Sequence, residues 1–188
     1  MLALQPQFTV SVEDQSPNLA TFVIEPLPQG YGHTLGNSLR RILYTSIPGA
    51  AITSVNIAGV NHQFTTIEGV SEDIVQIILA LKQVRVTYSG DKPVQIELSV
   101  KGPKVVTAAD FKVSSEVKIA NPDLVLADLS DKNAKLEITA TVEGGLGYSP
   151  AEDRKSTTVG VIPIDGVFTP VSRFNFTVDA SRVGRFSN

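Results

Sequence analysis

The 188-residue sequence contains no cysteine and no tryptophan, and it has only two histidines, His33 and His62. Disulfides, thiolate nucleophiles and cysteine-ligated zinc are therefore excluded for this chain. Two histidines cannot supply a zinc site that needs three histidine ligands. His33 could act as a general base, but no serine or aspartate stands at the spacing of a recognisable triad. We expect a capping or hydrogen-bonded role for His33 and an ordinary strand position for His62.

Long apolar runs are also lacking. No stretch reaches the roughly 18 residues that a membrane helix needs. The first 20 residues contain neither the basic region nor the long apolar region of a secretory signal, so we expect none. With 42% hydrophobic and 19% charged residues, the composition is that of a globular protein rather than a disordered one. A net charge of −3 is not the basic footprint of a protein that grips nucleic acid over its whole surface, although a local basic patch stays open.

Two segments have the periodicity of helices. Leu35, Leu39, Ile42 and Leu43 form one helical stripe, which predicts a helix over 34–46 with Thr34 as N-cap and Pro48-Gly49 as its end. A second stripe predicts a helix that carries Glu72 and Asp73 in its first turn, where negative charge is favoured. The second stripe consists of Ile74, Ile77, Ile78 and Leu81.

Most of the remaining chain alternates between apolar and polar residues, which predicts strands. The predicted strands lie at about 8–13, 20–25, 52–64, 84–88, 94–100, 117–119, 136–142, 159–164 and 174–178. A loop rich in glycine, serine, threonine and charge is predicted at 144–158, with Gly144–Gly147 as a flexible part of it. Because helices and strands do not alternate as βαβ units, we expect an α+β fold with antiparallel sheets.

A glycine-rich segment, Gly30-Tyr31-Gly32-His33-Thr34-Leu35-Gly36, precedes the first predicted helix. Such a loop could cradle a phosphate on free backbone amides, which would make the protein a small nucleotide-binding enzyme. Its spacing matches neither the dinucleotide fingerprint nor the P-loop, so a turn with a closely packed start of the helix is favoured.

Arg40 and Arg41 are adjacent in the first predicted helix, so their side chains diverge by about 100°. At least one of them must face away from the apolar stripe. The residue types alone leave two interpretations open: a solvated arginine pair, or a planar anchor at an interface. Glu72 and Asp73 also diverge, and no acidic cluster in the sequence suggests a magnesium site.

Several motifs, in one consistent order over nearly the whole chain, resemble the amino-terminal domain of the α subunit of bacterial-type RNA polymerase, from bacteria or plastids. The motifs are Glu25-Pro26-Leu27, Gly32-His33-Thr34-Leu35-Gly36-Asn37-Ser38-Leu39-Arg40-Arg41-Ile42-Leu43, Pro48-Gly49, Glu68-Gly69-Val70-Ser71-Glu72-Asp73-Ile74, Ala120-Asn121-Pro122-Asp123, Gly147-Tyr148 with Pro150-Ala151, and Ile164-Asp165 through Ser172-Arg173-Phe174. The resemblance implies two subdomains. A discontinuous α/β assembly and dimerisation subdomain would comprise 1–48 plus 164–188, and an inserted β-rich subdomain would comprise 49–163.

The resemblance implies a scaffold without catalytic residues or cofactors, which forms a homodimer and recruits the β and β′ subunits of the polymerase, itself a nucleotidyltransferase. The implied large-subunit contacts are Thr34, Asn37, Arg41, Tyr44 and Lys82. The implied dimer interface contains Tyr31, Leu35, Ser38, Leu39 and Ile42. Arg41 matches the family's main arginine for β-subunit binding and Lys82 matches a supporting lysine, whereas Tyr44 stands where leucine is frequent.

Family chains continue past the segment that matches Asp179–Val183 with a long helix that completes the dimer interface, whereas this sequence stops at Asn188. The resemblance therefore implies an assembly subdomain that is incomplete at its carboxyl end, and it puts dimerisation of this fragment in doubt. Direct DNA binding and membrane association are not expected, and the implied location is the bacterial cytoplasm or the plastid stroma. A nucleotide-binding enzyme using Gly30–Gly36 and a β-rich interaction module unrelated to transcription stand as the alternatives.

Overall fold

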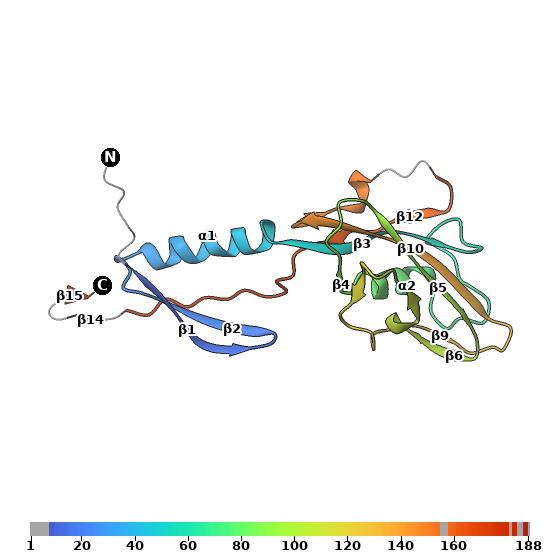
Figure 1. Cartoon of the computed structure of the whole chain (residues 1–188), viewed down its shortest axis with the longest axis horizontal. Helices are drawn as coiled ribbons and strands as arrows, with labels where there is room; N and C mark the ends of the chain where they lie inside the picture. The colour runs from blue at the N-terminus through green and yellow to red at the C-terminus, as the bar shows by residue number, and fades with distance from the viewer. Residues whose placement is uncertain (1–7, 155–157, 181, 184–185, 188) are drawn as a thin grey trace. The chain divides into compact units, whose positions relative to one another are not determined.

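A computed structural model of the chain describes residues 8–154, 158–180, 182–183 and 186–187. The chain divides into two compact units (Figure 1). Unit 1 comprises residues 1–42 and 173–188, and unit 2 comprises residues 43–172. Helices and antiparallel sheets are both present, which confirms the predicted α+β class. The subdomain limits implied by the resemblance, 1–48 plus 164–188 and 49–163, stay a prediction.

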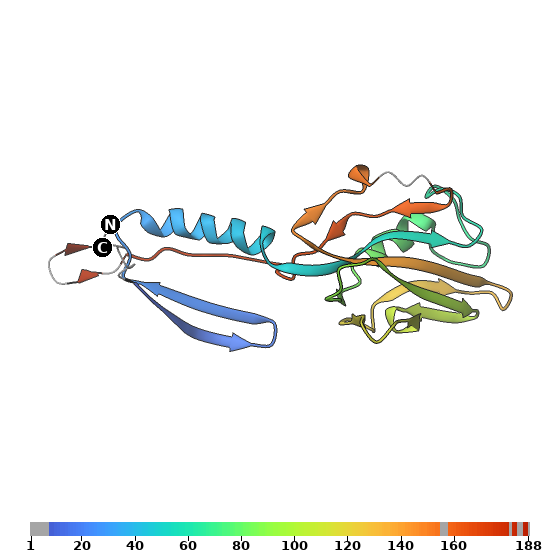
Figure 2. The ribbon, with the colours of Figure 1, turned by 45° about the horizontal axis from the view of Figure 1, so that its top comes forward.

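Unit 1 begins with a β-hairpin, as the alternation in the sequence predicts. Strands β1 (Thr9–Ser16) and β2 (Leu19–Glu25) pair antiparallel from Thr9 opposite Glu25 to Ser16 opposite Leu19, with a register shift between Val12 and Asp14 (Figure 2). Two short strands near the carboxyl end, β14 (Arg182–Val183) and β15 (Phe186–Ser187), also pair antiparallel.

Helix α1 (Tyr31–Thr45) begins three residues earlier than predicted, so the prediction of Thr34 as N-cap is wrong. Gly30 has φ of +80°, a backbone conformation that favours glycine, and it turns the chain into the helix. The Tyr31 amide donates to the carbonyl of Pro28 at 3.0 Å. Thr34 therefore lies inside α1, where its carbonyl accepts a hydrogen bond from the Ser38 hydroxyl at 2.8 Å.

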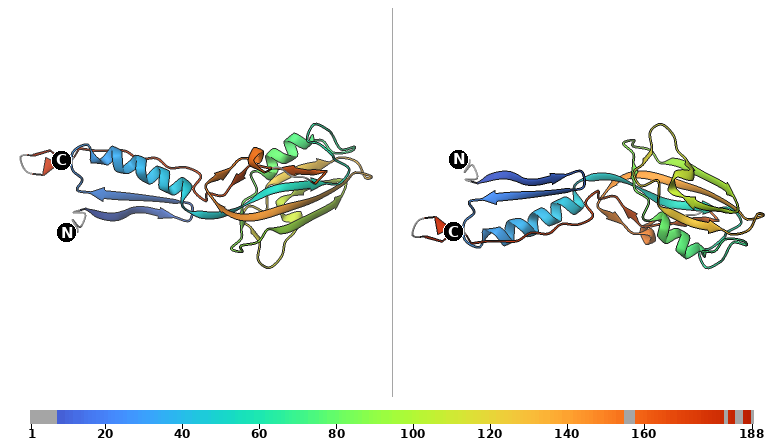
Figure 3. Two further views of the ribbon diagram at one scale, coloured as in Figure 1. Left: turned by 90° about the horizontal axis from the view of Figure 1, so that it is seen from above. Right: turned by 90° about the horizontal axis from the view of Figure 1, so that it is seen from below.

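The strand predicted over 174–178 is also wrong, because this segment belongs to no strand among the described residues. Instead it runs along α1, as Figure 3 shows. A Cβ placed on Gly36 would lie 2.5 Å from the Phe176 ring, and one on Gly32 would lie 2.9 Å from Val178. The alternation of apolar residues in this segment thus reflects packing against a helix and not pairing in a sheet.

Unit 2 is built on an antiparallel sheet of order β7-β5-β10-β3-β4-β8, to which β12 adds by pairing with β3. The strands are β3 (Pro48–Ile57), β4 (Val86–Thr87), β5 (Val94–Lys101), β7 (Phe111–Lys112), β8 (Lys118–Ile119), β10 (Lys135–Leu146) and β12 (Val161–Pro163). In β5 and over most of β10, buried and less buried residues alternate as the sequence predicts. The inward side chains, Leu136 and Ile138 among them, belong to one core cluster.

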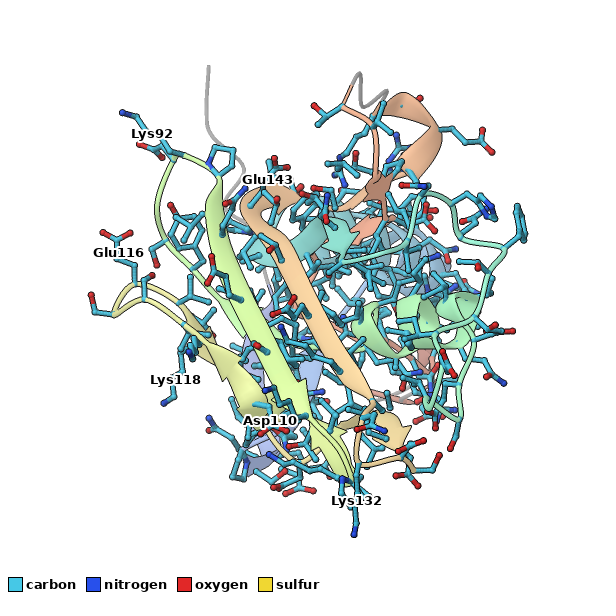
Figure 4. All side chains as sticks on the ribbon, turned by 90° about the vertical axis from the view of Figure 1, so that its right-hand side faces the viewer. Lys92, Asp110, Glu116, Lys118, Lys132 and Glu143 are labelled. Carbon is cyan, nitrogen blue, oxygen red and sulfur yellow. The ribbon has the colours of Figure 1, made fainter. Side chains whose placement is uncertain are left out.

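Two smaller pairs complete the strands of unit 2. Strand β6 (Lys104–Thr107) pairs with β9 (Val125–Leu129), and β11 (Tyr148–Ser149) pairs with β13 (Gly166–Val167). Two short 3₁₀ turns, η1 (Ala108–Asp110) and η2 (Ala151–Asp153), connect strands. Charged side chains such as those of Lys92, Glu116, Lys118 and Lys132 project from the periphery of this unit (Figure 4).

The predicted flexible loop at Gly144–Gly147 is wrong, because β10 continues to Leu146. Gly145 pairs with Gly49 of β3, and a Cβ on Gly145 would lie 2.9 Å from the ring of Phe168. These glycines therefore allow close packing within a sheet rather than flexibility. The last part of the predicted loop includes 155–157, which lie outside the described residues.

Helix α2 (Ile74–Leu81) confirms the second predicted helix, but Asp73 is its N-cap and does not lie within its first turn. Asp73 Oδ1 accepts from the Gln76 amide at 2.7 Å, and Gln76 Oε1 accepts from the Asp73 amide at 3.0 Å. This reciprocal capping box satisfies two backbone donors at the helix start. The inward side chains of α2, Ile74, Ile77 and Leu81, are fully buried in the core of unit 2.

Candidate protein-binding surface

Helix α1 carries four of the five predicted large-subunit contacts as one stripe. Thr34, Asn37, Arg41 and Tyr44 follow one another at intervals of three or four residues, which places them on the same helix face. The first three are exposed and Tyr44 is half-buried. This stripe offers hydroxyl, amide and guanidinium donors, a composition suited to polar contacts with another protein.

The predicted dimer residues form a second stripe on α1, adjacent to the first. Tyr31 and Ile42 are 48% and 53% exposed, although both are large and apolar over most of their surface. Leu35 and Leu39 are half-buried, so the stripe predicted as the buried side of the helix is only partly covered in this chain. Ser38 completes the stripe and donates its hydroxyl to Thr34 as described above.

The third face of α1 lies against the segment 173–178. Gly32 and Gly36 face Val178 and Phe176, and the Arg40 guanidinium lies 5.9 Å and 5.3 Å from the ring centroids of Phe174 and Phe176. A cation over an aromatic face within about 6 Å is attracted to it. The two arginines therefore differ, because Arg40 stacks on rings of its own chain whereas Arg41 belongs to the polar stripe.

The same face settles what the glycine-rich segment does. Gly32 and Gly36 lie within α1, and their small size admits side chains of the segment 173–178. The ring of His33 meets that of Phe176 edge-on with centroids 6.1 Å apart. Residues 31–36 are therefore a packed helical turn and not a phosphate loop, and the nucleotide-binding alternative is not supported.

In unit 2, Lys82 is the C-cap residue of α2 and forms an ion pair with Asp165. The Lys82 ammonium lies 2.7 Å from Asp165 Oδ2, and the Ala151 amide donates to Asp165 Oδ1 at 2.8 Å. The hydrogen bond from Lys82 and then that from the Ala151 amide hold the pKa of Asp165 below its usual value, assisted by the Tyr148 hydroxyl, although partial burial opposes this shift. The pairing of Asp165 with Lys82 could not be predicted from the sequence pattern, because 83 residues separate the two.

Arg154 braces the neighbouring backbone of unit 2. One of its guanidinium nitrogens donates to the carbonyl of Ile164 at 3.0 Å, and the guanidinium lies 5.7 Å from the centroid of the Phe168 ring. Two hydrogen bonds therefore connect η2 to the segment that contains Asp165. One comes from the Ala151 amide at the start of the turn, and the other comes from Arg154 directly after it.

The predicted strand position of His62 is wrong, because β3 ends at Ile57 and His62 lies in a bend. His62 lines an open pocket of about 350 Å³ together with Gln63, Ala151, Glu152 and Val161–Pro163. Across the residues that the structure describes, no three His, Asp or Glu side chains gather as a metal would require. Within the same residues, no helix is both long and apolar enough to cross a membrane.

Comparisons with known proteins agree with the resemblance in the motifs. Residues 55–169 match the family model described as "RNA polymerase Rpb3/RpoA insert domain". Proteins named "DNA-directed RNA polymerase subunit alpha" match from Roseiflexus castenholzii, with 47% identity over 94% of this chain and 54% of that protein, and from Syntrophomonas wolfei, with 50% identity over 96% and 58%. The protein of the same name from Bacillus velezensis is 48% identical over 96% of this chain and 57% of its own length.

The chain thus spans a little over half the length of the curated relatives that it matches. The family model covers more than half of this chain, and the motifs quoted above lie both inside and outside the matched range. From the matched insert domain and from relatives that align over nearly all of its residues, we conclude that the chain belongs to the α-subunit family of bacterial-type DNA-directed RNA polymerases.

Proposed function

We propose that this chain is the assembly scaffold of a DNA-directed RNA polymerase. It forms a homodimer through the stripe of α1 that contains Tyr31 and Ile42. The dimer recruits the β and β′ subunits through the stripe that contains Arg41 and through Lys82 of unit 2. The chain contributes no catalytic group of its own, and it works in the bacterial cytoplasm or the plastid stroma, where such polymerases transcribe.

The observation that carries this proposal is the division of α1 into three faces of different composition. One face packs against the segment 173–178, and the other two present an apolar stripe and a polar stripe. Apolar side chains as exposed as Tyr31 and Ile42 mark protein contacts when they are contiguous with others. The family membership supplies the partners, because the relatives are named as subunits of a multi-subunit enzyme.

Large-subunit capture tests the polar stripe. Tagged protein would be mixed with purified β and β′ subunits of the same organism, and the retained subunits would be quantified. We expect Arg41→Ala to weaken capture by about 2–5 kcal/mol, as for truncation of one partner in a buried charged contact. The matched control is Arg85→Ala, because Arg85 is an exposed arginine of unit 2 outside the proposed contacts. Equal capture by a folded Arg41→Ala protein and by the control would reject the proposal for this stripe.

A further inference from the structure

Asp165 binds to two other segments of unit 2 that are distant from each other in sequence. Its two carboxylate oxygens accept from the Lys82 ammonium at the end of α2 and from the Ala151 amide at the start of η2. Strand β11 (Tyr148–Ser149) pairs with β13, which begins directly after Asp165. The Asp165 side chain thus fixes the end of a helix and the start of a turn relative to each other.

The ion pair lies at the surface and is not part of the core. The side chains of Lys82 and Asp165 are 32% and 27% exposed, and Tyr148 is 60% exposed. Leu79 precedes Lys82 by three residues on α2, which places both on the same helix face, and it is 51% exposed. An exposed leucine and an ammonium therefore lie on one face of α2, and the ammonium is bound by a half-buried carboxylate, which is a composition suited to a protein contact.

A lysine free in solution has several rotatable bonds, and fixing it in a contact costs conformational entropy. The hydrogen bond to Asp165 orders the Lys82 ammonium before any partner arrives. An ammonium has three donors, so a partner can approach Lys82 with a carbonyl or carboxylate oxygen while Asp165 still holds it.

We propose that Asp165 is a positioning residue for large-subunit binding, which holds Lys82 in the arrangement that the partner meets. The proposal rests on the proposed function above and names a residue that acts through Lys82. The partner segment presents oxygen acceptors to Lys82 and an apolar group to Leu79.

Lys104 and Asp110 provide a matched control within the same unit. They form an ion pair, and the backbone amide of Thr107 donates to Asp110 at 3.0 Å, so this carboxylate also binds one ammonium and one amide. Asp110→Asn therefore removes the same kinds of interaction at a position outside the proposed contact.

A double-mutant cycle tests the proposal, with full-length protein titrated against purified β subunit and then against β with β′. We expect Asp165→Asn to weaken binding about 5- to 50-fold, and to change it less than twofold when Lys82→Met is already present. We expect Asp165→Glu, which keeps the charge, to recover part of the affinity. Asp110→Asn should leave the affinity unchanged.

Thermal melting of each variant separates positioning from general stability. Equal losses of binding affinity from Asp165→Asn with and without Lys82→Met would overturn the proposal. A loss of affinity from Asp110→Asn as large as that from Asp165→Asn would overturn it as well. If Asp165→Asn fails to fold, the comparison of Asp165→Glu with wild type in both Lys82 backgrounds decides in the same way. Failure of the unmodified protein to bind either large subunit would instead reject the proposed function itself.

Discussion

The two units of this chain differ most in how much apolar surface they bury. The described buried hydrophobic side chains all lie in unit 2, and most of them belong to one core cluster that includes residues of the main sheet, of α2 and of the β6–β9 pair. Phe168 is buried outside this cluster, against the glycine end of β10. In the described part of unit 1, Gly36 alone is buried. The difference shows that unit 2 has the means to fold by itself, whereas unit 1 has helix and hairpin geometry without a core.

The hairpin of unit 1 illustrates this contrast. Val12 and Phe22 stand directly opposite each other on β1 and β2, yet they are 52% and 60% exposed. A two-stranded hairpin is only marginally stable in water unless its apolar face packs against something else. We infer that unit 1 obtains much of its stability from association with other chains, in keeping with the proposed scaffold role.

The largest expected effect is the loss of stability caused by a cavity in the core of unit 2. Leu136 is fully buried on β10, so Leu136→Ala should lower the free energy of unfolding by about 2–5 kcal/mol. Urea unfolding followed by circular dichroism measures it. The control is Phe22→Ala in unit 1, which should cost no more than about 0.5 kcal/mol in the isolated chain because Phe22 is exposed. Equal costs would mean that unit 1 has a core after all.

The next effect concerns association through unit 1. Leu39→Asp places a charge in the half-buried apolar stripe of α1, and we expect it to weaken self-association by about 2–4 kcal/mol. Light scattering over a concentration series measures the mass. Asn37→Asp, on the polar stripe, introduces the same charge and should leave the mass unchanged. Loss of mass in both variants would show that charge, and not the apolar stripe, controls association.

A smaller effect is the pH dependence of stability, which we expect for unit 2 because Asp165 lies in that unit. The lowered pKa of Asp165 means that its hydrogen bonds from Lys82 and Ala151 stabilise the fold above the usual value of 3.8, and this contribution is lost as pH falls through the lower folded pKa. Asp165→Asn should therefore cost roughly 1–2 kcal/mol near pH 7. The cost should shrink as the pH is lowered into the acid range.

Unfolding of both proteins in urea at several pH values measures this difference. Asp123→Asn is the control, since Asp123 is an exposed carboxylate of the same unit. A cost of Asp165→Asn that is equal at neutral and acid pH would contradict the assignment of these bonds to the ionised carboxylate.

The smallest effect concerns the contact of Arg40 with the segment 173–178 on the third face of α1. Arg40→Ala removes the guanidinium from the rings of Phe174 and Phe176 and should cost about 0.5–1 kcal/mol. Hydrogen exchange should report faster exchange in 174–178, with unit 2 unaffected. Unchanged exchange in this segment would show that the glycine contacts of α1 hold it without Arg40.

Sequence patterns predicted best those elements whose burial repeats with a simple period. Strands β5 and β10 were predicted from alternation because one side of each strand packs into the core of unit 2. Helix α2 was predicted from its stripe for the same reason. The resemblance placed Arg41 and Lys82 in the site, and their roles stay predictions.

The failures occurred where a contact distant in sequence decides the local structure. Gly144 and Gly145 are typical of a loop, but pairing with β3 and the ring of Phe168 make them part of β10. The alternation at 174–178 is typical of a strand, but the glycine face of α1 replaces a neighbouring strand. Asp165 stands in one of the family motifs, but its pairing with Lys82 has no local signal, because Lys82 lies on a different element.

The chain enters and leaves unit 2 at neighbouring positions, and this has a consequence for exchanging the unit. Pro48 pairs with Leu146, and the backbone carbonyl of Phe168 lies against Gly49, so the chain leaves this unit beside the place where it came in. A unit with adjoining ends can be transplanted, because a short turn can close the gap that its removal leaves. Natural sequence change could use the same route, lengthening, shortening or exchanging the β-rich unit while α1 and the hairpin keep their own connections.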